Sequence, residues 1–297
     1  MKVKRAIALG FFDGVHIGHM SLLKRCCEIA ADKDLRSAAL TFSSHPDGLV
    51  LNSEIKTLST NEQRVEMLRR IGGVSEVLLL PFDNAMMHFD WRDFFKDILL
   101  KKYSASHLIS GESFRFGYKG LGTPEKLRTI CRENNISCDI VKDVKLDGMT
   151  VSSTIVKELI AKGEIEQANR FLGHAHEYTG RVVSGKGIGS KKLVPTINIE
   201  VDASVLLPPY GVYISKAYLG ETSYMAVTNI GVRPTFSNGG VTVETNAIGY
   251  SGNAYGETAR IELLRYLRPE HRFSDAKELL LQIERDITAA KSYFSGL

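Results

Sequence analysis

The chain has 297 residues, of which 43% are hydrophobic and 24% are charged, and its formal net charge is only +4. This length is enough for two domains, and the composition is typical of a globular protein rather than of a disordered or membrane-embedded one. No run approaches the roughly 18 apolar residues of a membrane span, and the scattered basic residues do not indicate a nucleic-acid partner.

The N-terminal residues and the cysteines give an expectation about location. Residues 1–5 lead directly into an apolar run without a signal-peptide core. The four cysteines form no CxxC pair, and no clustered histidines suggest a zinc site. We therefore expect four reduced thiols in a cytoplasmic protein, with at least one of Cys26 and Cys27 in a helix core.

Residues 6–19, AIALGFFDGVHIGH, join a short apolar strand to a helix. The strand ends at Gly10, a turn carries Asp13 and Gly14, and apolar positions at helical spacing begin near Gly18. A strand that runs straight into a helix aims the unpaired N–H groups and positive dipole end of the helix at the space above the strand. This arrangement suits a phosphate group.

Two histidines stand at the start of this helix. His16 and His19 are three residues apart, so a helical first turn places both imidazoles on one face. A single histidine is more often a structural residue, but a pair at this spacing after Asp-Gly favours chemistry. Gly14 and Gly18 allow the backbone to approach a ligand closely. The residues alone predict a nucleotide-phosphate site with two histidines beside it.

The rest of the first half alternates strands and helices, which predicts a parallel sheet with helices on both faces. Strands are expected at 37–42, 76–82 and 107–110, the second of them buried and closed by Pro81. Helices are expected at 59–71, capped by Ser59 or Thr60, and at 91–102. Ligands of such sheets bind beyond the carboxyl ends of the strands. The turns after Leu9, Phe42, Phe82 and Ser110 should therefore face one cleft.

The character of the chain changes to β-structure near residues 173–178. Short alternating runs follow, separated by Gly-rich turns, and only one late helix is expected, from Ser274 to about Tyr293. The expected strands are 179–183, 194–199, 210–214, 226–231, 241–245 and 259–266. A small closed barrel with one helix fits this pattern.

The run GFFDGVHIGH resembles the HxGH signature of nucleotidyltransferases, and its wording is similar to that of prokaryotic bifunctional riboflavin kinase/FAD synthetases. The resemblance implies an α/β chain whose residues 1–173 form a Rossmann-like FMN adenylyltransferase domain, which converts FMN and ATP to FAD and pyrophosphate. It implies catalytic roles for His16 and His19. It implies ATP or phosphate contacts from Gly10, Phe11, Asp13, Gly14 and Gly18.

Two further segments of the first half resemble the same family. Residues 41–46, TFSSHP, are similar to Phe-x-Pro-His-Pro, with Ser44 replacing the proline. Residues 111–117, GESFRFG, resemble Gly-x-Asp/Asn-Phe-x-Phe-Gly, where a serine replaces a longer polar side chain. The implied flavin contacts are His45, Ser113, Phe114 and Phe116. For the two phenylalanines, stacking on a ligand ring and ordinary core packing are both open.

Residues 151–158, VSSTIVKE, resemble the Ser-Ser-Thr-x-x-Arg motif of the family. Hydroxyls at a helix start can bind phosphate, and the resemblance implies this role for Ser152, Ser153, Thr154 and Lys157. Lys157 keeps the charge of the usual arginine but loses its planar fork. A plain capping box with Glu158 is the alternative.

The order of motifs in residues 174–297 resembles the riboflavin kinase module, a small barrel with a C-terminal helix that phosphorylates riboflavin with ATP to FMN. Residues 195–198, PTIN, are similar to its Pro-Thr-Ala-Asn element, which implies Mg²⁺ ligands at Thr196 and Asn198. Glu244 stands at the place of the catalytic base. Further implied contacts are Gly185 and Gly187 with phosphate, and Arg233 and Arg268 with flavin.

Three departures affect the kinase half. Leu193 and Ser190 replace usual glycines at the phosphate loop, and Asn246 stands where a histidine is typical. Phosphoryl transfer depends on positioning, so these changes predict a weaker activity. The leading hypothesis is a bifunctional enzyme with riboflavin, FMN and ATP as substrates. The alternatives are an FMN adenylyltransferase with a silent kinase half, a non-catalytic flavin or nucleotide sensor, and a transferase for another phosphate ester.

Overall fold

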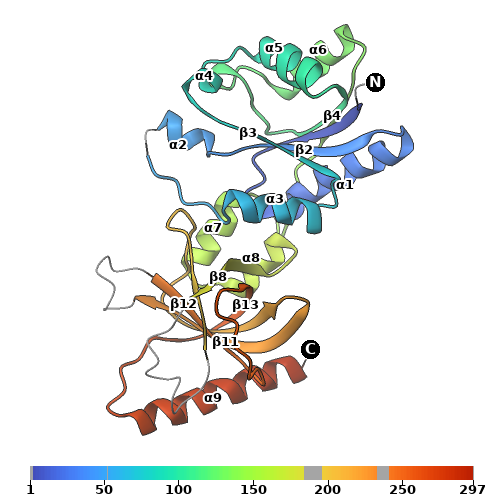
Figure 1. Ribbon diagram of the computed structural model, residues 1–297. Helices are drawn as coiled ribbons and strands as arrows, with labels where there is room; N and C mark the ends of the chain where they lie inside the picture. The colour runs from blue at the N-terminus through green and yellow to red at the C-terminus, as the bar shows by residue number, and fades with distance from the viewer. Residues whose placement is uncertain (1–2, 52, 184–195, 233–240, 297) are drawn as a thin grey trace. The chain divides into compact units, whose positions relative to one another are not determined.

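The structure is a computed structural model that describes residues 3–51, 53–183, 196–232 and 241–296 (Figure 1). Its internal contacts divide the chain into two compact units, Met1–Ser153 and Thr154–Leu297.

The first unit is built on a five-stranded parallel sheet in the order β3-β2-β1-β4-β5. From β1 the chain moves outward through β2 to β3, and it then returns to the other side of β1 as β4. This reversal between β1 and β4 is where open α/β sheets bind ligands, beyond the carboxyl ends of the strands. The strands are β1 (Arg5–Leu9), β2 (Arg36–Phe42), β3 (Glu76–Leu80), β4 (Ala105–Gly111) and β5 (Ser137–Val141).

Helices cover both faces of this sheet, as the sequence predicted. Alternate residues of β1 enter two different cores, Ile7 and Leu9 on one face and Ala6 and Ala8 on the other. The helices are α1 (Ile17–Asp32), α2 (Pro46–Val50), α3 (Asn61–Arg70), α4 (Asn84–Met87), α5 (Trp91–Asp93), the π-helix η2 (Phe94–Lys102) and α6 (Pro124–Glu133). Shorter elements are the 3₁₀ turns η1 (Asp13–Val15) and η3 (Tyr118–Gly120) and the hairpin of β6 (Lys145–Leu146) and β7 (Met149–Thr150).

Several local expectations are confirmed and one is wrong. Thr60 caps α3, with Gln63 completing a reciprocal capping box. Cys26 is fully buried while Cys27 is only half-buried. The strand expected to be buried is instead the edge strand β3, where Leu79 is 40% exposed. Strand order, which local sequence does not reveal, decides this exposure.

The second unit contains a closed antiparallel barrel in the order β10-β11-β12-β9-β8-β13, and a terminal helix, as expected. Apolar side chains from all six strands fill its interior. The strands are β8 (His176–Val183), β9 (Ile197–Glu200), β10 (Gly211–Leu219), β11 (Thr222–Val232), β12 (Val241–Ala247) and β13 (Thr258–Pro269). The helices are α7 (Ser153–Ala161), α8 (Ile165–Leu172) and α9 (Ala276–Ser295).

Helix α8 is attached to the barrel by side-chain and core contacts. Ile165 belongs to the barrel core, and Asn169 bridges two strands. Its Nδ2 donates to the Leu263 carbonyl at 2.8 Å, and its Oδ1 accepts from the His176 N–H at 2.8 Å. These contacts hold α8 on the barrel, and the division of the chain places nearly all of α7 in the same unit. The change to β-structure nevertheless begins only after Gly173.

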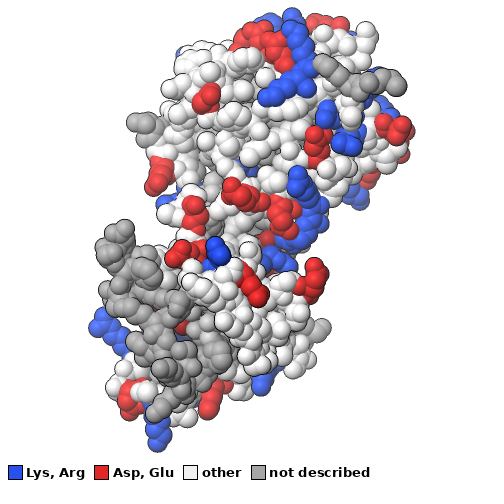
Figure 2. Space-filling model, in the orientation of Figure 1, with Lys and Arg blue, Asp and Glu red and all other residues white. Residues whose placement is uncertain are grey.

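Charged side chains of both signs are interspersed over the face shown in Figure 2. Within the described ranges, no helix is both long and apolar enough to cross a bilayer.

Candidate active sites

The turn after β1 has an unusual backbone. Phe12, Gly14 and Val15 have φ values of 60°, 74° and 43°, in the left-handed region that L-residues with side chains avoid. The Phe12 ring is fully buried and folds back under Gly10, where a Cβ atom would lie only 3.0 Å from the ring. A side chain at position 10 would therefore press on the buried Phe12 ring. The turn leads directly to His16, the N-cap residue of α1.

His16 and His19 share one face at the start of α1, as their spacing predicted. The His19 backbone N–H donates to His16 Nδ1 at 3.2 Å, so His16 caps the helix. The two imidazoles stack with their centroids 3.5 Å apart and their planes 16° apart. A Cβ atom on Gly18 would lie 3.1 Å from the His16 ring, so glycine leaves room for the stack. The two rings form a compact pair at the positive end of the helix.

His19 is a neutral imidazole near pH 7. Burial holds its pKa well below the usual value, and the neighbouring charges of His16 and Arg64 lower it further. Its Nδ1 is buried and has no hydrogen-bond partner among the described residues. A neutral imidazole can donate one N–H to a phosphate oxygen without carrying a charge of its own.

Asp13 fastens the turn to two other segments. Its Oδ1 accepts from the Leu58 N–H at 2.8 Å, and its carbonyl accepts from Ser153 Oγ at 2.9 Å. Ser153 is thereby brought to the turn, beside Ser152 in the chain. Thr154 is exposed and Lys157 half-buried on the continuing helix α7, which is grouped with the second unit. The predicted phosphate roles of these four residues stay predictions.

The predicted flavin residues of the first unit follow β2 and β4. His45 meets the Phe11 ring edge-on, at 4.6 Å between centroids. Phe116 is 5% exposed and belongs to a core cluster, and its flavin contact stays a prediction. Phe114 is half-buried and stacks on Phe116 at 5.7 Å, and Ser113 is exposed.

Arg64 is the residue that the sequence interpretation missed. It is fully buried on α3, its Nη2 donates to the Phe42 carbonyl and to Asn61 Oδ1 at 2.6 Å each, and its guanidinium lies 4.2 Å from the centroid of the Phe11 ring. A signal was present, because Arg64, Leu68 and Ile71 recur at helical spacing on one face. An arginine in such a stripe indicates a buried charge.

The second candidate site lies on neighbouring strands of the barrel. Register places Asn198 of β9 directly opposite Glu244 of β12. Thr196 Oγ1 donates to Glu244 Oε1 at 2.8 Å, and Asn198 Nδ2 lies 3.5 Å from Thr196 Oγ1. Asn198 is 2% exposed. The fold thus brings the three residues implied for metal binding and proton transfer into contact.

These three side chains offer ligand atoms of the kind that fit a magnesium ion. A hydroxyl, an amide oxygen and a carboxylate are hard ligands of the kind that Mg²⁺ takes. The described residues contain no group of three or more His, Cys, Asp or Glu side chains that could hold a metal by themselves.

Arg268, predicted to contact flavin, is engaged elsewhere in this structure. Its Nε and Nη2 donate to the carboxylate of Asp286, with Nη2 at 2.7 Å from Oδ2, and this ion pair holds α9 against the barrel. Asn246 is 9% exposed on β12. The remaining predicted residues, Gly185, Gly187, Ser190, Leu193 and Arg233, lie outside the described residues.

Comparison with family models covers both units. A model described as FAD synthetase matches residues 2–155, more than half of the chain, and one described as riboflavin kinase matches residues 172–294. A Bacillus subtilis relative, a bifunctional riboflavin kinase/FMN adenylyltransferase, is 30% identical, covering 100% of this chain and 94% of the relative. The chain belongs to this bifunctional family.

Other members of the family match over the same extent. The bifunctional riboflavin kinase/FMN adenylyltransferase of Listeria monocytogenes is 29% identical, covering 99% of this chain and 94% of the relative. The relative from Escherichia coli K12 is 30% identical, covering 97% of this chain and 92% of the relative. Both halves of the chain therefore have counterparts in the family, which favours the bifunctional hypothesis over a single activity.

One solved structure has a similar fold over nearly the whole chain. A crystal structure of a macrolide-efflux protein from Streptococcus pneumoniae superposes with a TM-score of 0.86 and 25% identity, covering 98% of this chain and 95% of the other. A shared fold does not fix function, so the efflux name stays with that protein.

Proposed function

We propose that this chain catalyses two ATP-dependent steps of flavin cofactor synthesis: phosphorylation of riboflavin to FMN, and adenylylation of FMN to FAD with release of pyrophosphate. The observation that carries the proposal is the presence of two candidate sites in one chain of this family. The first unit has the stacked His16–His19 pair, and the second has the Thr196–Glu244 contact.

In the adenylyl step, a phosphate oxygen of FMN attacks the α-phosphorus of ATP, and the bond to the β-phosphate oxygen breaks. His16 and His19 lie at the start of α1, where helix N–H groups and the helix dipole favour negative charge. We infer that their imidazole N–H groups stabilise the charge that develops on the α-phosphate and on the departing pyrophosphate. Neutral His19 still has one ring N–H with which it can donate to a phosphate oxygen.

In the kinase step, the terminal ribityl hydroxyl of riboflavin attacks the γ-phosphorus of ATP, and ADP leaves. Glu244 is the proposed base that accepts the hydroxyl proton. Thr196 and Asn198 would hold the magnesium ion, which when bound neutralises phosphate charge. Thr196 contacts both Glu244 and Asn198, so the proposed base and ligands lie within one small area of the barrel.

We also propose that the functional boundary lies near Gly173, with an adenylyltransferase domain at 1–173 and a kinase domain at 174–297. Gly173 has a left-handed φ of 79° and ends α8, and β8 begins at His176.

A cytoplasmic location is in keeping with the four free cysteines and with ATP as co-substrate.

The test is direct. Purified chain is incubated with ATP and Mg²⁺ and either riboflavin or FMN, and the flavins are separated by chromatography. We expect FMN and then FAD from riboflavin, and FAD from FMN. Absence of FAD in both reactions would overturn the adenylyltransferase assignment. If FAD forms from FMN but no FMN forms from riboflavin, the kinase assignment is overturned and the adenylyltransferase assignment stands.

A further inference from the structure

Arg64 is the largest fully buried side chain among the described residues, with 1% of its surface exposed. Removing a guanidinium from water costs free energy, and a methionine or leucine would fill the same space without that cost. Its Nε is buried with no hydrogen-bond partner among the described residues, so hydrogen bonds satisfy only part of the group. A charge placed at this cost calls for an explanation.

The contacts of Arg64 join three segments at the carboxyl ends of β1 and β2. Nη2 donates to the carbonyl of Phe42, the last residue of β2, and to Asn61 at the start of α3. The guanidinium lies against the Phe11 ring, in the turn after β1. Thr41 Oγ1 donates to the Phe11 carbonyl at 2.7 Å and fixes the same turn from β2. The Arg64 side chain thus links the end of β2, the start of α3 and the turn that leads to the histidine pair.

Arg64 also acts on this turn through its charge. Burial lowers its pKa to about 10, so the guanidinium stays charged at neutral pH, and Asp13 and Glu62 favour that charge. The titratable groups that act on His19 are His16 and Arg64. The positive field of Arg64 therefore reaches one of the two residues proposed to act on the phosphates.

We propose that Arg64 is a positioning residue for adenylyl transfer, which fixes the Phe11 turn against the end of β2 and sets the electrostatic field at His19. The proposal rests on the proposed adenylyltransferase function. Because Arg64 is 1% exposed, it acts through Phe11 and His19 and not by touching the substrate.

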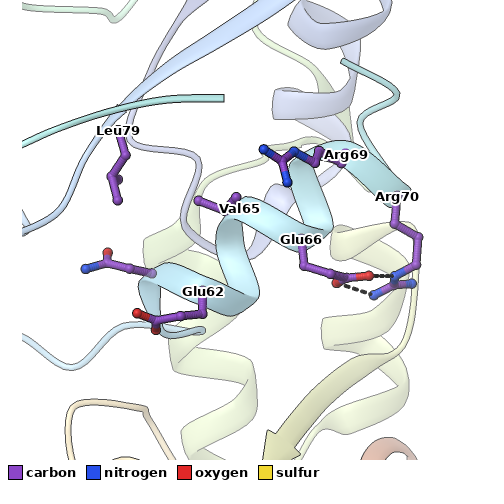
Figure 3. Close-up of a pocket in the computed structure, with 7 residues that line it drawn as sticks. Glu62, Val65, Glu66, Arg69, Arg70 and Leu79 are labelled. Carbon is purple, nitrogen blue, oxygen red and sulfur yellow. Dashed lines mark hydrogen bonds and ion pairs between the residues drawn. The ribbon is translucent and has the colours of Figure 1, made fainter. Parts of the chain in front are cut away.

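The helix supplies a matched control. Arg69 and Arg70 lie beside a surface hollow on the outer side of α3, where Arg70 pairs with Glu66 (Figure 3). Arg69 is exposed and loses the same guanidinium group when changed to methionine. The experiment compares Arg64→Met, Arg64→Lys and Arg69→Met in the full chain.

The first readout is kinetic. We expect Arg64→Met to lower kcat for FAD formation by about tenfold or more while changing the KM for ATP by less than about threefold. Arg64→Lys, which keeps the charge, should recover part of this loss. Arg69→Met should match the parent chain, and riboflavin phosphorylation should be unchanged in all three. An Arg64→Met chain with the kcat of the parent would overturn the proposal.

The second readout does not need activity. The His19 imidazole is titrated by ¹H–¹⁵N NMR in the same variants, and we expect its midpoint to rise in Arg64→Met but not in Arg69→Met. A parent chain that makes no FAD would refute the proposed function, and this titration would then decide alone. A His19 midpoint unchanged in Arg64→Met would refute the electrostatic role of Arg64.

Discussion

The site after β1 and the site on the barrel bring their functional groups together by different means. In the first, residues 10–19 form a continuous run, and the backbone of the turn itself places the two imidazoles. In the second, Thr196 and Glu244 come from β9 and β12, which only the register of the barrel aligns. A contiguous motif carries its geometry locally, whereas a cross-strand site depends on the whole sheet being closed. The two activities should therefore respond separately to changes at each site.

The largest expected effect is on the barrel site. Glu244→Gln removes the proposed base and should reduce FMN formation from riboflavin by about 10²–10⁴-fold. FAD formation from supplied FMN should be unchanged, because the histidine pair is intact. Glu200→Gln, at an exposed position of β9, is the control. Retained phosphorylation in Glu244→Gln, measured by flavin chromatography, would remove Glu244 from the mechanism.

The reciprocal change is His19→Ala. Loss of one donor to the developing phosphate charge should lower FAD formation by about 10²–10³-fold. Riboflavin phosphorylation by the same preparation should proceed at the parent rate, which also reports that the chain has folded. An equal fall in both activities would indicate a folding defect and would contradict a separate role for His19.

A buried histidine outside both sites offers a smaller test on stability. Burial lowers the pKa of His176 to about 3, and His174 adds to this effect. The unfolded chain binds the proton near pH 6.5, so the free energy of unfolding should fall between pH 6.5 and 3, by at most about 1.4 kcal/mol per pH unit. His176→Gln should make that dependence shallower in denaturant titrations. Replacing the exposed His271 with glutamine should not.

The smallest expected effect concerns Leu193, which lies outside the described residues. The kinase motif that this segment resembles has glycine here, which would let the backbone come close to a phosphate. Leu193→Gly should therefore raise the rate of riboflavin phosphorylation by about severalfold. FAD formation from FMN serves as the internal control. A rate that stays the same or falls would show that the leucine does not crowd the phosphate loop.

The sequence predicted best where geometry follows from adjacent residues. The strand–turn–helix of residues 6–19 and the shared face of His16 and His19 follow from spacing alone. The exposure of Leu79 could not be foreseen, because strand order is a property of the assembled sheet. Arg64 was missed because a charged residue is read as solvent-facing, even where helical spacing aligns it with Leu68.

The barrel residues show the opposite limit. Periodicity predicted the strands of the second half, but no local pattern tells which strand lies beside which. Asn198 and Glu244 were placed in one site only through resemblance to a family, and their cross-strand pairing was first visible in the structure. For Arg268, the resemblance implied a flavin contact. The structure shows in addition an ion pair with Asp286 of α9, which no local pattern in the sequence predicts.

The strand order of the barrel also has a consequence for biosynthesis. Its first strand in the chain, β8, pairs with its last, β13, so the barrel cannot close before Pro269 has been synthesised. All five strands of the parallel sheet are complete at Val141 and can assemble while the barrel strands are still emerging from the ribosome. The half that performs the second chemical step is thus complete first. Nascent chains that stop short of Thr258 leave β8 and β10 with unpaired edges, and we expect such products to aggregate.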